Sequence, residues 1–183
     1  KTKSVLRKIL TSWIFFRTML FALLFLGGGV FLTFTRWSEF SILLFVIFFT
    51  VIFCFQYKVF PISKVIVKAY DNFFFSGKTL ADLKDRPVIA IGSSNLHSGR
   101  PFTFSKIKMS DSSYIFRQEY NPPIEFNPDN FPIAAAVAAS SCVPFAFSPI
   151  TIDKVFFATQ SDFDRVRPIL IDGGVYDNQG IQK

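Results

Sequence analysis

The sequence predicts an α/β domain preceded by a two-helix transmembrane hairpin, and three observations support this architecture. Two long runs without a charged side chain, Thr18–Thr35 and Phe40–Tyr57, occupy the first third of the chain. A helix of small residues is expected from Pro132 to Pro144, because alanine propagates helices and proline suits their first turn. A short apolar strand, Ile169–Ile171, ends directly at Asp172. Ligands bind at the carboxyl ends of strands in open α/β sheets, so Asp172 is a candidate site residue.

Charge and hydrophobicity separate the two regions. The chain has 183 residues, 50% of them hydrophobic, and a formal net charge of +7. Residues 1–68 carry nine Lys or Arg and one acid, whereas residues 69–183 carry eleven Lys or Arg and twelve acids. The basic excess therefore belongs to the amino-terminal third, and it indicates a membrane surface rather than a nucleic-acid partner. Membrane lipids are the partners that this distribution predicts.

Each apolar run is long enough to cross a bilayer, since a helix of that length measures about 27 Å. We expect a membrane anchor over residues 1–60, with transmembrane helices at about 14–35 and 40–57, and a second domain over 61–183. A buried pair of core helices is the alternative, but such helices usually carry a polar stripe. A signal peptide is disfavoured because there are two apolar runs and no small-residue cleavage site.

The flanking charges predict an orientation for this hairpin. Lys and Arg precede the first run and follow the second, while the loop between the runs carries Arg36 and Glu39. The positive-inside bias then places both ends, and the domain that follows, on the cytoplasmic side of an integral membrane protein.

Cys54 and Cys142 suggest neither a disulfide nor a metal site. Gly27–Gly29 is interpreted as a close helix–helix contact.

The remaining elements of the second domain follow from local patterns. A helix with one apolar face is expected around Val65–Tyr70. Buried or paired strands are expected at Pro87–Gly92, Phe102–Ser105, Ser113–Arg117 and Val155–Phe157, with a strand hairpin around Asp111. Loops or polar connections are expected at Ser93–Pro101, Asn121–Asn130 and Ser161–Arg167.

Two segments are distinctive: Ala-Ala-Ser-Ser-Cys-Val-Pro at 138–144 and Asp-Gly-Gly-Val-Tyr-Asp-Asn at 172–178. Together they resemble the patatin-like phospholipase family. Gly77–Leu83, Asn95–Pro101 and Phe102–Phe104 agree with the family in the same order. The combination is more specific than any one motif. The resemblance covers roughly residues 68–183 and implies the carboxyl-terminal part of a patatin-like α/β/α domain.

The resemblance also implies a chemistry. In this family a serine attacks an ester carbonyl, and an aspartate in an Asp-Gly-Gly motif takes its proton, without a metal or cofactor. Asp172 matches that aspartate, and Gly173, Gly174 and Asn178 support the motif. Gly173 and Gly174 are expected to adopt backbone angles that a side chain would forbid. Asp177 and Asn178 are expected to hold the loop after Asp172 through bonds to the backbone.

The sequence departs from the family pattern at the nucleophile, because it contains no Gly-x-Ser-x-Gly. The nearest segment is Gly-Ser-Ser-Asn-Leu at 92–96, and we interpret Ser93 and Ser94 as structural or pocket-lining. The nucleophile is therefore expected upstream of Lys1 in a longer protein, with the hairpin inserted between nucleophile and base. His97 is expected to be a polar loop residue rather than a triad member. Arg100 remains open between a phosphate contact and a surface role.

Two hypotheses follow. The first is a fragment of a membrane-anchored lipid acyl hydrolase that carries the catalytic Asp172 of a Ser-Asp dyad and acts on phospholipids or other acyl lipids. The second is a catalytically inactive membrane protein that keeps the patatin fold and binds lipid or a partner. An intact Asp-Gly-Gly favours the first, and the missing nucleophile keeps the second open.

Overall fold

The structure is a computed structural model of residues 1–183, and it describes all of them except 1–2, 4–5, 8–9, 60, 145 and 177–183. The chain divides into two compact units, Lys1–Val65 and Ile66–Lys183. Each unit is described by itself.

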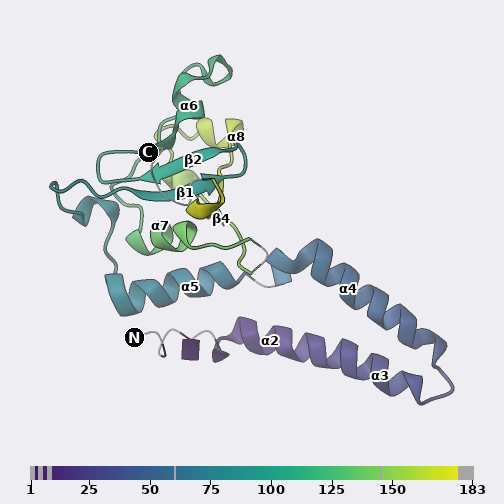
Figure 1. The fold of residues 1–183 in the computed structure, drawn as a ribbon. Helices are drawn as coiled ribbons and strands as arrows, with labels where there is room; N and C mark the ends of the chain where they lie inside the picture. The colour runs from purple at the N-terminus through teal and green to yellow at the C-terminus, as the bar shows by residue number, and fades with distance from the viewer. Residues whose placement is uncertain (1–2, 4–5, 8–9, 60, 145, 177–183) are drawn as a thin grey trace. The chain divides into compact units, whose positions relative to one another are not determined.

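The first unit contains two long apolar helical segments. The first consists of α2 (Trp13–Ala22), the π-helical turn η1 (Leu23–Gly27) and α3 (Gly28–Thr33), and it begins where the Ser12 hydroxyl accepts a hydrogen bond from Phe15 N. The second is α4 (Glu39–Val59). The two lie side by side in antiparallel directions (Figure 1), with Ser41 Oγ donating to Gly29 O at 2.9 Å and the Phe21 and Phe48 rings 5.8 Å apart.

Only part of the predicted transmembrane hairpin is supported. Within the described part of the chain, one helix, Trp13–Thr33, is long and apolar enough to span a membrane, and it lies near the amino terminus. The second helix contributes a shorter apolar segment, Glu39–Phe55, within the described residues. That the second helix also crosses the membrane therefore stays a prediction. Of the three glycines Gly27–Gly29, the expected close helix–helix contact is found at Gly29, where a Cβ would lie 2.9 Å from the Phe45 ring.

The second unit is built on a five-stranded sheet. Its strands are β1 (Ile91–Asn95), β2 (Arg100–Phe104), β3 (Met109–Asp111), β4 (Ile150–Thr151) and β5 (Ile169–Asp172). They are ordered β3-β2-β1-β5-β4, and each neighbouring pair is antiparallel. The helices are α5 (Ile62–Tyr70), which spans the boundary between the units, α6 (Ser112–Phe116), α7 (Ile133–Ser140) and α8 (Asp162–Arg165). This mixture of helices and sheet confirms the α/β class.

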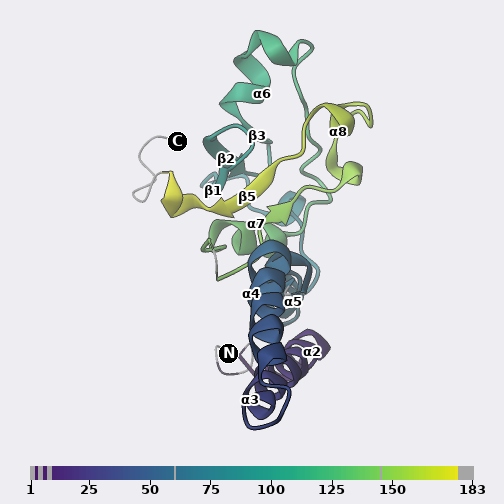
Figure 2. The same ribbon diagram turned by 90° about the vertical axis from the view of Figure 1, so that its right-hand side faces the viewer.

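Helix α7 lies along one face of the sheet and contacts both β1 and β5 (Figures 1 and 2). Its small side chains allow this close approach, since Ala134, Ala136 and Ala139 are fully buried. Phe102, Phe104 and Leu170 point to the same sheet face by strand alternation, and all three are fully buried. The core therefore forms between this face, α7 and the loops that follow β3.

Turns of 3-10 or π-helix connect these elements. They are Asp71–Phe75, Leu80–Asp82, Gln118–Tyr120, Lys154–Phe156 and Gly173–Val175. Thr79 and Asp82 form a capping box around the second of these turns, where Thr79 N donates to Asp82 Oδ2 at 2.8 Å.

Several predicted elements agree with the structure. The small-residue helix is α7, which ends before Pro144, and the apolar strand is β5, which ends at Asp172. The strand expected at Phe102–Ser105 is β2, shifted by one to two residues. The amphipathic helix around Val65–Tyr70 is α5.

The strand predicted at Pro87–Gly92 is wrong. Strand β1 begins only at Ile91 and runs through the polar residues to Asn95, so most of the predicted loop Ser93–Pro101 belongs to β1 and β2. Val88 and Ile89 are 60% and 42% exposed. Ser94 and Asn95 of β1 are buried with hydrogen bonds to distant residues, and hydropathy does not detect these bonds.

The strands predicted at Ser113–Arg117 and Val155–Phe157 are also wrong. The Asp111 side chain accepts hydrogen bonds from Ser113 N and Tyr114 N, which caps α6 in place of a strand hairpin. Lys154–Phe156 forms a 3-10 turn. The polar connection predicted at Ser161–Arg167 contains the short helix α8.

Candidate functional site

Asp172 occupies the last position of β5, where the strand passes into the turn Gly173–Val175. Its backbone N donates to Cys142 O at 2.9 Å, which ties the strand end to the segment after α7. Its Oδ1 accepts from Gly174 N at 2.9 Å and so caps the turn. Among the described residues, Oδ2 has no hydrogen-bond partner. The half-buried carboxylate is thus held by one oxygen while the other is available.

Gly173 is required for space rather than for its backbone angles. Both glycines of the motif lie in a 3-10 turn, whose right-handed conformation is open to other residues, so the expected forbidden angles are not adopted. A Cβ on Gly173 would lie 2.7 Å from Gly92 O, closer than real Cβ contacts come. The missing side chain lets the end of β5 pass directly against β1.

Ser94 stabilises the turn that follows Asp172. Its hydroxyl accepts from Tyr176 N at 3.1 Å and lies 3.4 Å from Gly173 O, to which it donates. The side chain is buried and makes these two backbone contacts across about eighty positions of sequence. These contacts agree with the structural role expected for Ser94.

Ser93 lies directly opposite Asp172 in the β1–β5 pair. Opposed residues of an antiparallel pair point to the same face of the sheet, so Ser93 and Asp172 share one face. The Ser93 side chain is 1% exposed, and its Oγ has no hydrogen-bond partner among the residues that the structure describes.

Asn95 connects three strands through a buried hydrogen-bond network that sequence reasoning missed. Its Nδ2 donates to Asp111 Oδ2 at 2.8 Å and to the Tyr114 hydroxyl at 2.7 Å. Its Oδ1 accepts from His97 N at 3.1 Å and from Ile169 N at 3.3 Å. The network links β1 to β3, α6 and β5, and therefore fixes the strand that carries Asp172.

The network also accounts for the one histidine of the chain. His97 Nδ1 lies 3.2 Å from the Tyr114 hydroxyl, and burial raises the pKa of that phenol above its ordinary value. The described contacts of His97 are with Asn95 and Tyr114 rather than with Asp172. His97 is therefore a polar residue of this network.

Asp111 is the charged centre of the same network. Its Oδ1 accepts from Ser113 N at 2.8 Å, Ser113 Oγ at 2.5 Å and Tyr114 N at 3.2 Å. Its Oδ2 accepts from Ser98 Oγ at 2.6 Å as well as from Asn95. The sequence signal that could have located it is an aspartate before Ser-Ser-Tyr, which is typical of a helix N-cap.

Two site expectations remain without structural description, because Asp177 and Asn178 lie outside the described residues. Within the described residues, no group of three or more His, Cys, Asp or Glu side chains could hold a metal ion.

The fold and the site together define an α/β protein in which a strand end delivers a carboxylate into a glycine turn. The model of the patatin-like phospholipase family matches residues 19–182, and the chain therefore belongs to this family. The match confirms the resemblance, and it begins within α2, so it also includes the apolar helices. At the family level, it indicates a lipid acyl hydrolase. Neither the curated proteins nor the solved structures gave a match to this chain.

Proposed function

We propose that the protein is a membrane-anchored, serine-dependent lipid acyl hydrolase in which Asp172 is the general base of a Ser-Asp dyad. One observation carries the proposal: a strand-end aspartate has one carboxylate oxygen held by Gly174 N and the other without a described partner. Family membership supports ester hydrolysis at the general level. The fixed oxygen orients the carboxylate, and the other can receive a proton.

The chemistry requires a base because a serine hydroxyl is a weak nucleophile at neutral pH. As the serine oxygen attacks the ester carbonyl carbon, its proton passes to Asp172. The proton then goes to the oxygen of the departing alcohol, which leaves an acyl-serine. Water repeats the sequence with Asp172 again as base, releases the fatty acid and restores the serine.

The nucleophile is proposed to come from outside these 183 residues. The chain contains no Gly-x-Ser-x-Gly. Ser94 Oγ is bonded to the backbone of the turn that follows Asp172. Ser93 shares a sheet face with Asp172 but is only 1% exposed. The apolar helices would hold this site at the membrane that supplies its substrate, with both ends of the hairpin in the cytoplasm.

Replacement of Asp172 by Asn in the full-length protein tests the dyad. The exchange keeps size and hydrogen bonding but removes the base, so hydrolysis of a fluorogenic acyl ester in detergent should fall about 10²- to 10⁴-fold. Asp164→Asn makes the same chemical change at an exposed aspartate and should leave the rate unchanged.

Three results would reject the proposal. If the full-length protein is active and Asp172→Asn does not change its rate, Asp172 is not the general base. If the full-length protein is inactive, the alternative of a lipid-binding protein without catalysis is favoured. Turnover by the 183-residue chain alone that Ser94→Ala abolishes would place the nucleophile in β1.

A further inference from the structure

Ser93 and Asp172 lie opposite each other where β1 pairs with β5. Leu96 N donates to Ile169 O at 2.8 Å in this ladder, whereas Asp172 N donates to Cys142 O outside it. Hydrogen-bonded and non-hydrogen-bonded pairs alternate along an antiparallel ladder, so Ser93 and Asp172 form a pair of the second kind. The Cα atoms of such a pair lie only about 4.5 Å apart, which brings the two side chains close together.

The other neighbours of Ser93 on this face offer its hydroxyl no acceptor. Asp111, Phe102, Ser93 and Asp172 form one row across four strands, so Phe102 separates Ser93 from Asp111. Along β1, the next polar side chain on the same face is Asn95. Its Oδ1 already accepts two hydrogen bonds and its Nδ2 donates two. Asp172 is therefore the polar neighbour with capacity left.

Helix α7 covers this face of the sheet with apolar side chains (Figures 1 and 2). Its buried residues are one isoleucine and four alanines, whose side chains cannot accept a hydrogen bond. Ser93 is 1% exposed, and its Oγ has no hydrogen-bond partner within the part of the chain that the structure describes. A buried hydroxyl without a partner costs free energy, so its retention at this position requires an explanation.

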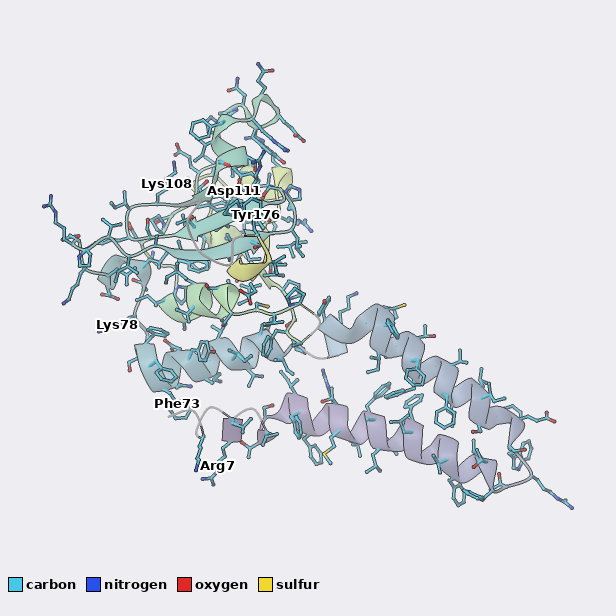
Figure 3. The ribbon with its side chains drawn as sticks, in the orientation of Figure 1. Arg7, Phe73, Lys78, Lys108, Asp111 and Tyr176 are labelled. Atoms are coloured by element: carbon cyan, nitrogen blue, oxygen red, sulfur yellow. The ribbon has the colours of Figure 1, made fainter. Side chains whose placement is uncertain are left out.

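The Asp172 carboxylate has one acceptor atom to offer. Its Oδ1 accepts from Gly174 N, whereas its Oδ2 has no hydrogen-bond partner among the described residues. Figure 3 shows Tyr176, which follows this turn, beside the sheet, and its N donates to Ser94 Oγ at 3.1 Å. The turn is thus fixed against β1. Rotation about χ1 of Ser93 redirects its hydroxyl without moving the backbone.

We propose that the Ser93 hydroxyl donates a hydrogen bond to Asp172 Oδ2 and thereby positions the proposed general base. The role of Asp172 as base rests on the proposed function, whereas the bond itself does not. With Gly174 N on one oxygen and Ser93 on the other, the plane of the carboxylate is fixed. A carboxylate oxygen has two acceptor sites, so Oδ2 still receives the proton of the nucleophile. A hydrogen bond to an ionised acceptor is strong, so Ser93 also stabilises the charged form that acts as base.

Replacement of Ser93 by Ala in the full-length protein tests the positioning role. The kcat for a fluorogenic acyl ester should fall about tenfold, because a hydrogen bond to a charged group is lost. The KM should stay within about twofold, because a buried side chain does not touch the substrate. The urea midpoint should fall as well. A hydroxyl without a partner predicts the opposite: its removal would raise the midpoint and leave kcat unchanged.

A double-mutant cycle measures the bond without reference to activity. Its members are the parent, Ser93→Ala, Asp172→Ala and the double variant, compared by their urea midpoints. Alanine is used at position 172 because the amide of an asparagine could still donate to Ser93 Oγ. Ser93→Ala should lower the midpoint of the parent and should not lower that of Asp172→Ala. The cycle gives an answer even if the full-length protein is inactive.

Ser110→Ala is the matched control, because Ser110 is also a buried serine of the sheet, 8% exposed. It lies on β3 opposite Thr103, on the face that does not carry Ser93, and its Oγ donates to Asp111 O at 3.2 Å. Ser110→Ala should leave kcat unchanged. Its effect on the midpoint should be the same in the parent and in Asp172→Ala.

Three outcomes separate the inference from the proposed function. Equal effects of Ser93→Ala on the midpoint with and without the Asp172 carboxylate would overturn the bond. Coupled midpoints with an unchanged kcat would overturn the positioning role. An unchanged rate in Asp172→Asn would instead reject the proposed function, and the cycle would then decide the bond alone.

Discussion

At the end of β5, single backbone contacts fix the position of the Asp172 carboxylate. Asp172 is fixed by Cys142 O and Gly174 N, and both contacts depend on the path of the backbone through Gly173. A Cβ on Gly173 would lie 2.7 Å from Gly92 O, so the site has no room for a methyl group. The neighbour is a backbone atom, which cannot rotate away as a side chain could. Gly173 therefore controls the position of the carboxylate through excluded volume.

Replacement of Gly173 by Ala should destabilise the second unit by about 1–3 kcal/mol, because the new Cβ must displace a strand. The displacement should also lower the hydrolysis rate of the full-length protein, since Asp172 moves with the turn. Urea unfolding and the ester assay measure the two effects. Val175→Ala, in the same turn at a side chain 56% exposed, is the control and should change neither.

If Gly173→Ala unfolds at the same urea concentration as the parent and keeps its rate, the tight approach of β5 to β1 is not a property of the protein in solution.

The packing of the two apolar helices shows the same excluded-volume effect between secondary-structure elements. Gly29 faces the Phe45 ring, and its carbonyl accepts from Ser41 Oγ, so the helices touch where the side chain is smallest. At Gly27, two residues earlier in the π-helical segment, a Cβ would meet no atom within 4 Å. Gly29 therefore lies in the helix–helix contact, whereas Gly27 lies outside it.

Gly29→Leu should push the helices apart and lower the thermal midpoint in detergent, while Gly27→Leu should not. Both exchanges replace glycine by a good helix former, which by itself favours the helix by about 0.8 kcal/mol. Their difference therefore isolates packing against Phe45. Circular dichroism during heating gives the midpoints, and equal midpoints for the two variants would contradict the contact.

Elements were predicted well where hydrophobicity alone decides them and poorly where polar side chains do. Helix α7 and strand β5 follow from alanine content and an apolar run. Strand β1 was misplaced because Ser93, Ser94 and Asn95 are buried, the last two through hydrogen bonds to distant residues. These partners lie far along the chain, and no local pattern contains them.

At the scale of the whole molecule, the first unit carries the excess of positive charge and the apolar helices, and the second carries the sheet and the site. Among the residues that the structure describes, one helix, Trp13–Thr33, is long and apolar enough to cross a membrane. The crossing of the second helix and the cytoplasmic location of both ends are proposals that rest on flanking charge.

Labelling with a membrane-impermeant maleimide tests this topology. In a chain with Cys54 and Cys142 replaced by serine, Ser38→Cys in the interhelical loop should react from outside intact cells. Lys84→Cys in the second unit should react only after permeabilisation. Both positions are exposed, so access is limited by the membrane alone. Labelling of both from the same side would show that only one crossing, or none, exists.

The sequence by itself determined the α/β class, the apolar helices, the Asp-Gly-Gly strand end and the family, because each depends on composition or on a contiguous motif. Tertiary structure decided the antiparallel order of the strands, the Asn95 network and the function of Ser94 in the turn. Each of these requires residues that lie far apart in the chain to meet. These long-range contacts depend on strand register and helix capping, which neighbouring residues alone do not specify.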